Sequence, residues 1–253
     1  MATQRRENLK NLLLSIPDNG IVCAAYLCKE GLSHDNLKQY VQHGYLDSLG
    51  RGAYCKHNQH PNLASALHAL AFQLNHSSHL GGRAALARQG LLHFLPYSDE
   101  AATIYTRHNT RLPAWFKKSF GEKFICRGTN FLPQNLAVET KELDGFSVPS
   151  SMPERAILEY LLDVPTAHPL NEAYQIMEMM TNARLDILQQ LLESCSSIKV
   201  KRLFFLLAED LNYAWYEDLD QSKIDLGSGC RIIDKGGTYQ SKWNVVVKDW
   251  KEI

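Results

Sequence analysis

Residues 20–56 read GIVCAAYLCKEGLSHDNLKQYVQHGYLDSLGRGAYCK, and this stretch decides the fold of the N-terminal region. The pattern predicts a short helix from Ala24 to Glu30, a tight turn at Gly31, a longer helix capped by Ser33, and a hairpin. An amphipathic helix over residues 5–16 precedes them. This order of elements predicts a winged helix-turn-helix, a module that places its second motif helix in the DNA major groove.

The helix that follows Ser33 has two different faces when its residues are placed about 100° apart. Leu37, Tyr40 and Val41 cluster on one side, and polar residues occupy the other. Gln and Asn amides can make paired hydrogen bonds to adenine, and Lys contacts guanine or phosphate. A plain solvated helix face is the alternative. The hairpin that follows this helix, with its tip at residues 50–52, is called the wing. We predict a DNA-binding surface formed by this face, the wing and their flanks: Ser33, His34, Asn36, Lys38, Gln39, Gln42, Arg51 and Lys56.

The hairpin carries one cation between two glycines. The runs Tyr45–Leu49 and Ala53–Cys55 can pair as strands, with Gly50-Arg51-Gly52 at the tip. Glycines allow a sharp backbone turn and leave Arg51 projecting. A cation on a hairpin tip beside a three-helix unit can reach phosphate or the minor groove, although a plain hairpin with a solubilising Arg has the same sequence.

The rest of the chain predicts a mixed α/β domain whose second half is helical. Short strand-like runs fill residues 101–148, and a helix follows that we expect to start with a capping box of Ser151 and Glu154. The predicted fold class is α+β, with a winged helix at residues 1–60 and a second domain at 61–253 that can divide near 150. Further segments predict these helices and one C-terminal strand pair: 62–74, 83–89, 171–180, 183–194, 199–210, and two strands around 235–237.

Composition limits the classes of function. The 253 residues carry 27 Lys and Arg and 27 Asp and Glu, so the formal net charge is zero. A protein that coats nucleic acid without selectivity is usually more basic, so any DNA contact should be local and selective. We find no apolar signal segment, no run long enough to cross a membrane, no CxxC pair and no coiled-coil heptads. We therefore expect a cytoplasmic protein with reduced cysteines that is a monomer in solution.

Several candidate sites for chemistry are incomplete in the sequence. Cys55-x-His57-x-x-His60 and His76-x-x-His79 contain ligand-type residues, but neither supplies the four paired ligands of structural zinc. Gly81-Gly82 precedes a helix, as phosphate-binding glycines do, without the longer pattern of a P-loop. We predict no catalytic residue, no metal and no cofactor, and interpret the glycine pair as a turn.

Glu139-Thr-Lys141 supports an alternative from another class of function. In a strand these two charged side chains share a face, as in many metal-dependent nucleases, where acids bind Mg²⁺ and Lys stabilises charge on the phosphate. The upstream acid that completes this arrangement is missing from the preceding strand-like runs. A DNA-targeted nuclease using Glu139 and Lys141 is our alternative function, and a transcription factor that senses a small ligand through an apolar pocket is a third.

Six motifs in a fixed order carry a resemblance to a known family: GRGAY (50–54), HLGGRAAL (79–86), RLPAWF (111–116), SMPERA (151–156), KVKRLF (199–204) and DLGSG (225–229). The chain resembles AbiEi-type antitoxins of bacterial type IV toxin–antitoxin systems, which act in abortive infection and phage defence. The resemblance spans nearly the whole chain.

The resemblance implies two roles. The N-terminal domain is expected to bind inverted repeats in its own promoter and repress the operon. The C-terminal domain is expected to counter an AbiEii-type nucleotidyltransferase toxin without forming a stable complex with it. The family supplies no catalytic residues. Basic surface residues of the C-terminal domain are implicated in general terms, and we assign them to Lys199, Lys201 and Arg202 at the start of one predicted helix.

Overall fold

The computed structural model describes residues 2–92 and 101–251, and the chain is α+β as predicted. Backbone contacts divide it into two compact units, each built from separate segments. Unit 1 comprises the described residues up to His79 together with Asn109–Ile125 and Thr140–Pro149. Unit 2 comprises the described residues of Leu80–His108, Cys126–Glu139 and the chain from Ser150 onward. The predicted boundary at residue 60 stays a prediction.

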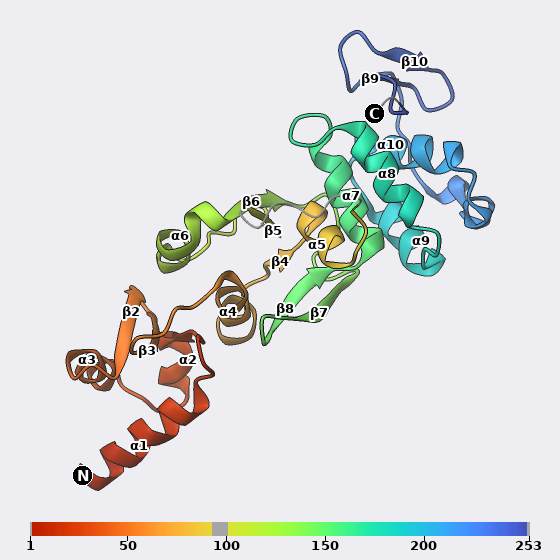
Figure 1. Ribbon diagram of the computed structural model, residues 1–253. Coiled ribbons are helices and arrows are strands. Elements are labelled where there is room, and N and C mark those ends of the chain that lie inside the picture. The colour runs from red at the N-terminus through yellow and green to blue at the C-terminus, as the bar shows by residue number, and fades with distance from the viewer. Residues whose placement is uncertain (1, 93–100, 252–253) are drawn as a thin grey trace. The chain divides into compact units, whose positions relative to one another are not determined.

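Unit 1 begins with three helices and a small antiparallel sheet (Figure 1). The sheet order is β1-β3-β2, with Val22 opposite Tyr54 and Leu46 opposite Lys56. A buried apolar cluster that includes Leu12 joins the helices to the sheet. The order of these helices and strands matches the predicted order, and their identity as a winged helix-turn-helix stays a prediction. The elements are α1 Ala2–Ser15, β1 Val22–Cys23, α2 Ala24–Lys29, α3 His34–Gln42, β2 Leu46–Gly50 and β3 Ala53–Lys56.

Two further helices of unit 1 lie outside this motif. The predicted helix at 62–74 forms as α4 Leu63–His68, which continues as a π-helical turn, Ala69–Gln73. The Gln73 side chain accepts a hydrogen bond from the Cys23 amide at 2.7 Å and donates to the Ile21 carbonyl at 2.7 Å. It thereby occupies the open backbone groups beside the edge strand β1. The second helix, α6 Ala114–Phe120, was not predicted.

The predicted strand-like runs of residues 101–148 form most of a five-stranded sheet. Its order is β6-β5-β4-β8-β7, and β4 pairs with β8 in parallel. The two-residue strand β4 was missed because it is too short to show a pattern. The strands are β4 His79–Leu80, β5 Ala102–Arg107, β6 Phe124–Thr129, β7 Val138–Leu143 and β8 Phe146–Ser151.

The helices of unit 2 enclose its large apolar core. Met177 and Met180 are buried in it, and Met179 is half-buried. The start of α7 corrects our prediction, because Met152 is its N-cap residue and no side chain caps it. The helices are α5 Gly82–Arg88, α7 Pro153–Asp163, α8 Leu170–Met179, α9 Leu185–Ser194 and α10 Ile198–Asp210, followed by short 3-10 turns at Ala214–Asp218 and Gln221–Lys223.

A small sheet follows near the C-terminal end of the described chain. We predicted two strands on either side of residues 235–237, and β9 Arg231–Ile232 and β10 Thr238–Gln240 lie there. They do not pair with each other, because β11 Val245–Val247 lies between them in the order β10-β11-β9. Among the described residues, no helix has the length and apolar character needed to cross a membrane.

Candidate nucleic-acid interface

The turn between α2 and α3 fixes where α3 begins. Gly31 has a φ of +93°, a left-handed conformation that favours glycine, and the Leu32 amide donates to the Leu27 carbonyl at 3.0 Å. The Ser33 hydroxyl accepts a hydrogen bond from the Asn36 amide at 3.1 Å, and the Asn36 side chain accepts one from the Ser33 amide at 3.2 Å. This reciprocal capping box satisfies amides at the helix start. Ser33 and Asn36, which are both predicted to contact DNA, thus also cap the N-terminal end of α3.

The two faces of α3 are those predicted from its periodicity. Leu37 and Tyr40 are buried against the rest of unit 1. Lys38, Gln39 and Gln42 are exposed, and Lys38 lies one helical turn from Gln42 on the same side. The exposed side of α3 therefore offers two amides and one ammonium group, which can donate and accept hydrogen bonds at base edges and phosphates.

The predicted His34 contact lies at the first turn of α3. The side chain is exposed, and its Nε2 atom lies 3.7 Å from the Cys28 sulfur on α2. This contact joins the two helices of the motif at the turn between them. His34 is thus held at the N-terminal end of the polar face, with the ring accessible to solvent.

The wing is shaped by its two glycines. Gly50 has a φ of +142° and Gly52 a φ of +87°, and the strand register shifts between Ser48 and Gly50. Both φ values disfavour other residues, as expected for this tip. Arg51 between them is exposed, and no residue in the described part of the chain binds its side chain. The structure therefore leaves the guanidinium group of Arg51 available to a ligand.

Lys56 differs from the other predicted contacts. It lies opposite Leu46, at the end of the β2–β3 hairpin away from the tip. Its ammonium group forms an ion pair with Asp18, with 3.1 Å between Nζ and Oδ1. Lys56 thus belongs to the base of the hairpin, and its charge is already paired within unit 1.

α6 packs on the wing and was missed in the sequence. The Trp115 side chain lies so close to Gly50 that a Cβ atom added there would be 3.0 Å from Trp115 Cβ. The Ser119 hydroxyl donates to the Leu49 carbonyl at 3.2 Å. The signal in the sequence is the run AWFKKSF, whose aromatic residues are buried, but this run stands among the strand-like runs of residues 101–148, and no helix is predicted there. The exposed residues of α6 include two adjacent cations, Lys117 and Lys118.

The predicted antitoxin surface at the start of α10 is not a surface. Lys201 and Arg202 are each 2% exposed. Arg202 donates to backbone carbonyls at residues 226, 227, 229 and 244, at distances from 2.6 to 3.1 Å. Lys199 donates to the carbonyls of residues 162 and 164, and burial lowers its pKa. The Arg202 and Lys199 side chains thus hold neighbouring backbone segments in place, and Lys201 is buried, so the prediction of an exposed basic patch there is wrong.

The Gly81-Gly82 turn is filled by a carboxylate of the protein itself. The Gly82 amide donates to Glu159 Oε2 at 2.9 Å, and the Ser151 hydroxyl donates to the same oxygen at 2.8 Å. Arg155 Nε donates to Glu159 Oε1 at 2.7 Å. A Cβ atom on Gly81 would overlap Glu159, so glycine is required there. The pair is a turn, as predicted, and two of the motifs quoted above meet in this buried network.

The candidate metal residue Cys55 lies on β3, and the candidate nuclease residues lie on β7. Burial raises the pKa of the Cys55 thiol to about 11, and His57 Nδ1 instead lies 2.9 Å from Asp47 Oδ1. Within residues 2–92 and 101–251, no three His, Cys, Asp or Glu side chains form a group that could hold a metal ion. Glu139 is half-buried on β7 and Lys141 is exposed on it, and the nuclease hypothesis stays an untested alternative.

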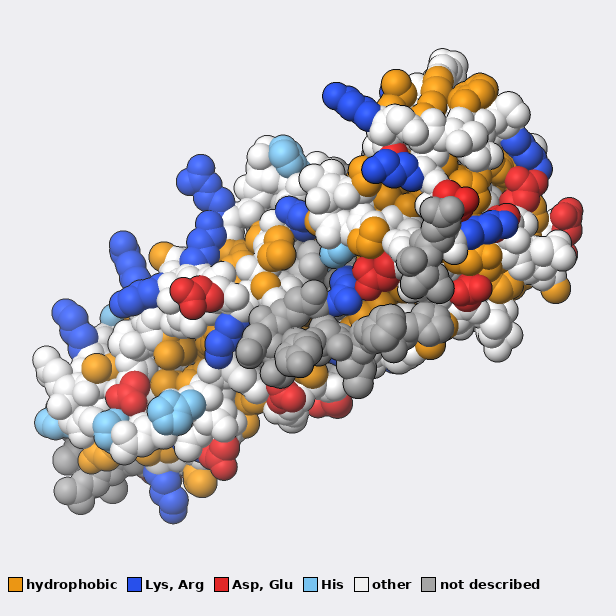
Figure 2. Space-filling view, turned by 45° about the horizontal axis from the view of Figure 1, so that its top comes forward, with side chains coloured by type: hydrophobic (Ala, Val, Ile, Leu, Met, Phe, Trp, Pro, Cys, Tyr) orange, Lys and Arg blue, Asp and Glu red, His pale blue; other side chains and the backbone are white. Residues whose placement is uncertain are grey.

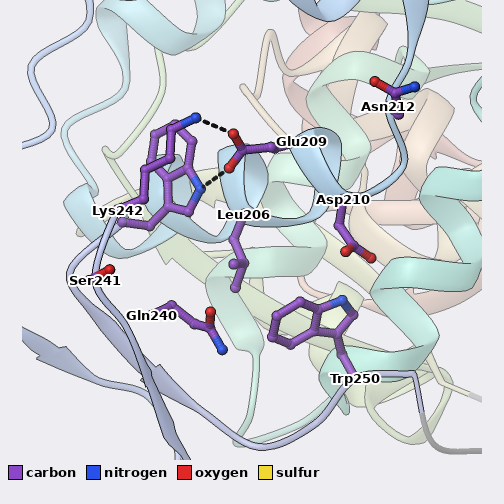
Figure 3. Close-up of a pocket in the computed structure, with 9 residues that line it drawn as sticks. Leu206, Glu209, Asp210, Asn212, Gln240, Ser241, Lys242 and Trp250 are labelled. Atoms are coloured by element: carbon purple, nitrogen blue, oxygen red, sulfur yellow. Dashed lines mark hydrogen bonds and ion pairs between the residues drawn. The ribbon is translucent and has the colours of Figure 1, made fainter.

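A pocket of about 540 Å³ opens at the end of α10 (Figure 3). Figure 3 shows the Glu209 carboxylate directed towards Lys242, with which it forms an ion pair. Asp210 and Trp250 lie on another side of the pocket, and Asp210 Oδ1 pairs with Lys251 Nζ at 2.8 Å. The lining is mixed, with paired charges beside indole rings, and differs from the apolar pocket that the ligand-sensing alternative requires.

Comparisons with known proteins extend this description to the whole chain. Residues 5–97 match a family model described as the N-terminal domain of transcriptional regulators that are AbiEi antitoxins, and residues 99–248 match one described as transcriptional regulator, AbiEi antitoxin, type IV toxin–antitoxin system. Comparison with curated proteins finds no match. The crystal structure of the RV2827C protein from Mycobacterium tuberculosis shares the fold, with a TM-score of 0.61 and 14% identity over 96% of this chain and 91% of that chain. The chain therefore belongs to the AbiEi antitoxin family of type IV toxin–antitoxin systems.

Proposed function

We propose that this protein represses its own operon by binding inverted repeats in the promoter through α3 and the wing. The observation that carries the proposal is the exposed polar face of α3, Lys38, Gln39 and Gln42, in the same unit as the unpaired Arg51. An α-helix fits the major groove, which is about 12 Å wide and displays a different pattern for each base pair. The neutral net charge favours selective over general binding.

Each residue of the surface has a role that follows from its chemistry. Gln39 and Gln42 read base edges, because a terminal amide can donate to and accept from one base at once. Lys38 contacts guanine or a phosphate beside them. Arg51 enters the minor groove or binds the backbone next to it, while Ser33 and His34 contact phosphates near the start of α3. Asn36 is already bonded in the capping box and contributes by fixing that start.

Repression from inverted repeats requires two copies of the chain on the DNA. We propose that the protein is a monomer in solution and that two monomers occupy half-sites with the same face of the helix. Half-sites read by such motifs are spaced by about one helical turn, roughly 34–36 Å, or a multiple of it.

We further propose that the chain counters an AbiEii-type nucleotidyltransferase toxin without forming a stable complex with it. The support is family membership, since these family models describe antitoxins of type IV systems. The basic residues of α10 do not supply an exposed surface for this role, and we assign no residues of unit 2 to it in their place.

The two roles can be tested with one variant. A chain with Lys38, Gln39 and Gln42 all changed to Ala should no longer repress a reporter driven by its own promoter. The three side chains are exposed, so folding and rescue of growth from the co-expressed neighbouring toxin should persist. Unchanged repression by the folded variant would contradict the assignment of the DNA-reading face. Failure of the unaltered chain to rescue growth would contradict the antitoxin role.

A further inference from the structure

We infer that α6 is a second DNA-contacting element, in which Lys117 and Lys118 bind the phosphate backbone that flanks the half-site. The inference rests on the proposed operator binding and extends it to a segment outside the helix-turn-helix motif. α6 belongs to the part of the sequence matched by the second family model, yet backbone contacts place it in unit 1 with the wing.

The first observation is a local excess of positive charge. Residues 109–125 contain four cations and one acid, Glu122, in a chain whose net charge is zero. All four cations are exposed, and no residue of the described chain forms an ion pair with any of them: Arg111, Lys117, Lys118 and Lys123. Figure 2 shows Lys and Arg side chains projecting along the edge that holds α3, the wing and α6.

The second observation is that α6 and the wing are fixed to each other. Trp115 packs directly on Gly50, and the Ser119 hydroxyl binds the Leu49 carbonyl just before the wing tip. The aromatic side chains that anchor α6 on its inner side also pack together, with ring centroids of Trp115 and Phe116 5.6 Å apart. A protein that places Arg51 on DNA therefore holds Lys117 and Lys118 at a set distance from the same duplex.

The chemistry of the exposed face selects the partner. The aromatic residues of α6 are buried, so its outer side offers ammonium groups without an apolar patch for a protein or lipid. A seven-residue helix is about 10 Å long, and one DNA strand carries a phosphate about every 3.4 Å. Two lysines on α6 can therefore neutralise neighbouring phosphates on one strand. Such contacts carry no base preference, because phosphates are the same at every position.

The test compares how the affinity of the protein for two DNA duplexes depends on the salt concentration. One duplex ends at the half-site read by α3 and the wing, and the other extends it by about 10 base pairs on each side. The Lys117→Ala/Lys118→Ala variant is compared with a Lys235→Ala/Lys248→Ala variant, which removes the same charge from exposed positions of unit 2. Thermal unfolding of both variants serves as the folding control, and unchanged midpoints are expected because all four side chains are exposed.

We expect the Lys117/Lys118 variant to lose about 1.8 from the slope of log affinity against log salt on the long duplex, since each contact contributes about 0.9. Between about 50 and 200 mM salt, the affinity of the unaltered protein should then fall about tenfold more than that of the variant. The short duplex and the unit 2 control should show no such change, and base preference should stay the same.

Three results would overturn the inference. Equal slopes for variant and unaltered protein on the long duplex would exclude contact with phosphate. An equal decrease of the salt slope on both duplexes would place the lysines inside the half-site. A decrease of the slope in the unit 2 control would show a general effect of net charge. Failure of the proposed repressor function looks different, because the unaltered protein would then bind its promoter no better than random DNA, while the slope comparison on the long duplex still tests α6.

Discussion

Unit 1 and the α10 region of unit 2 both contain basic residues, and these residues have opposite environments. In unit 1, Lys38 and Arg51 are exposed and unpaired within the described chain. In α10, Lys201 and Arg202 are almost fully buried, and Arg202 donates four hydrogen bonds to backbone carbonyls. The comparison teaches that a basic residue is available to a ligand only where the fold leaves its charge exposed and without an internal partner.

The strongest prediction concerns the buried side of this comparison. Arg202→Ala should lower the free energy of unfolding by about 3 kcal/mol, because four hydrogen bonds from a buried charged donor to partly buried backbone carbonyls are lost. Arg202→Lys should restore little of it, since an ammonium group lacks the planar fork that reaches all four oxygens. Denaturant titration measures both, with Arg51→Ala as the control that should stay within about 0.5 kcal/mol. Equal losses of unfolding free energy in Arg51→Ala and Arg202→Ala would show that the exposed and the buried arginine contribute equally to stability, which would contradict this prediction.

The second prediction sharpens the comparison through pH. Glu154 is 1% exposed; burial raises its pKa, but hydrogen bonds from Arg184 lower it more, so the net shift is downward. A carboxyl group whose pKa is lower in the folded state stabilises the fold at pH values above its pKa in the unfolded state, about 4.3. This contribution is lost as the pH falls through the pKa of the folded state. Glu154→Gln should therefore cost about 1–3 kcal/mol near pH 7, with the gap to the unaltered protein narrowing below about pH 5.

That pH dependence can be measured by denaturant titration at a series of pH values. Glu178→Gln on α8 is the matched control, because Glu178 is exposed and should show a much smaller gap. If the difference in unfolding free energy between Glu154→Gln and the unaltered protein stays constant down to about pH 3, the prediction is wrong, because the ion pair of Glu154 and Arg184 would then contribute nothing through ionisation.

The third prediction concerns the exposed side of the comparison. Gln39→Ala should leave stability unchanged and reduce discrimination at one base pair by about 1–3 kcal/mol, because a bidentate amide contact is lost. Competition binding with singly substituted promoter duplexes measures the effect at each position. Gln134→Ala, an exposed glutamine of unit 2, is the control. Uniform weakening at all positions, or none, would show that Gln39 does not read a base.

The smallest expected effect is that of Arg51→Ala. Affinity should fall by a similar factor for every sequence, and the salt slope should decrease by about 0.9, because a phosphate contact carries no sequence information. Fluorescence anisotropy over a salt series measures the slope, with Lys248→Ala as the control of equal charge. A change of base preference without a change of slope would assign Arg51 to base reading.

The local parts of the fold could be predicted from the sequence. Gly31, Ser33 and the two wing glycines determine turns within a few residues of themselves, so their backbone roles were visible without the structure. The apolar spacing of α3 gave its buried face for the same reason, since helical periodicity depends only on neighbouring residues. The strand-like runs of residues 101–148 likewise matched strands.

Features that depend on distant residues could not be predicted. The burial of Arg202 results from loops that lie 24 to 42 residues later in the chain. The Gly81-Gly82 turn resembles a phosphate cradle until Glu159 fills it. The helix α6 could not be predicted because it is short, lies among strand-like runs and depends on packing against the wing.

We propose above that the exposed polar face of α3 and the wing select one DNA sequence. The most direct measurement is the ratio of affinities of the purified, unaltered chain for the DNA upstream of its gene and for a random duplex of equal length, at about 150 mM salt. The upstream DNA should bind at least about 10³-fold more tightly, as specific sites do. A ratio near one, with the protein folded, would contradict it.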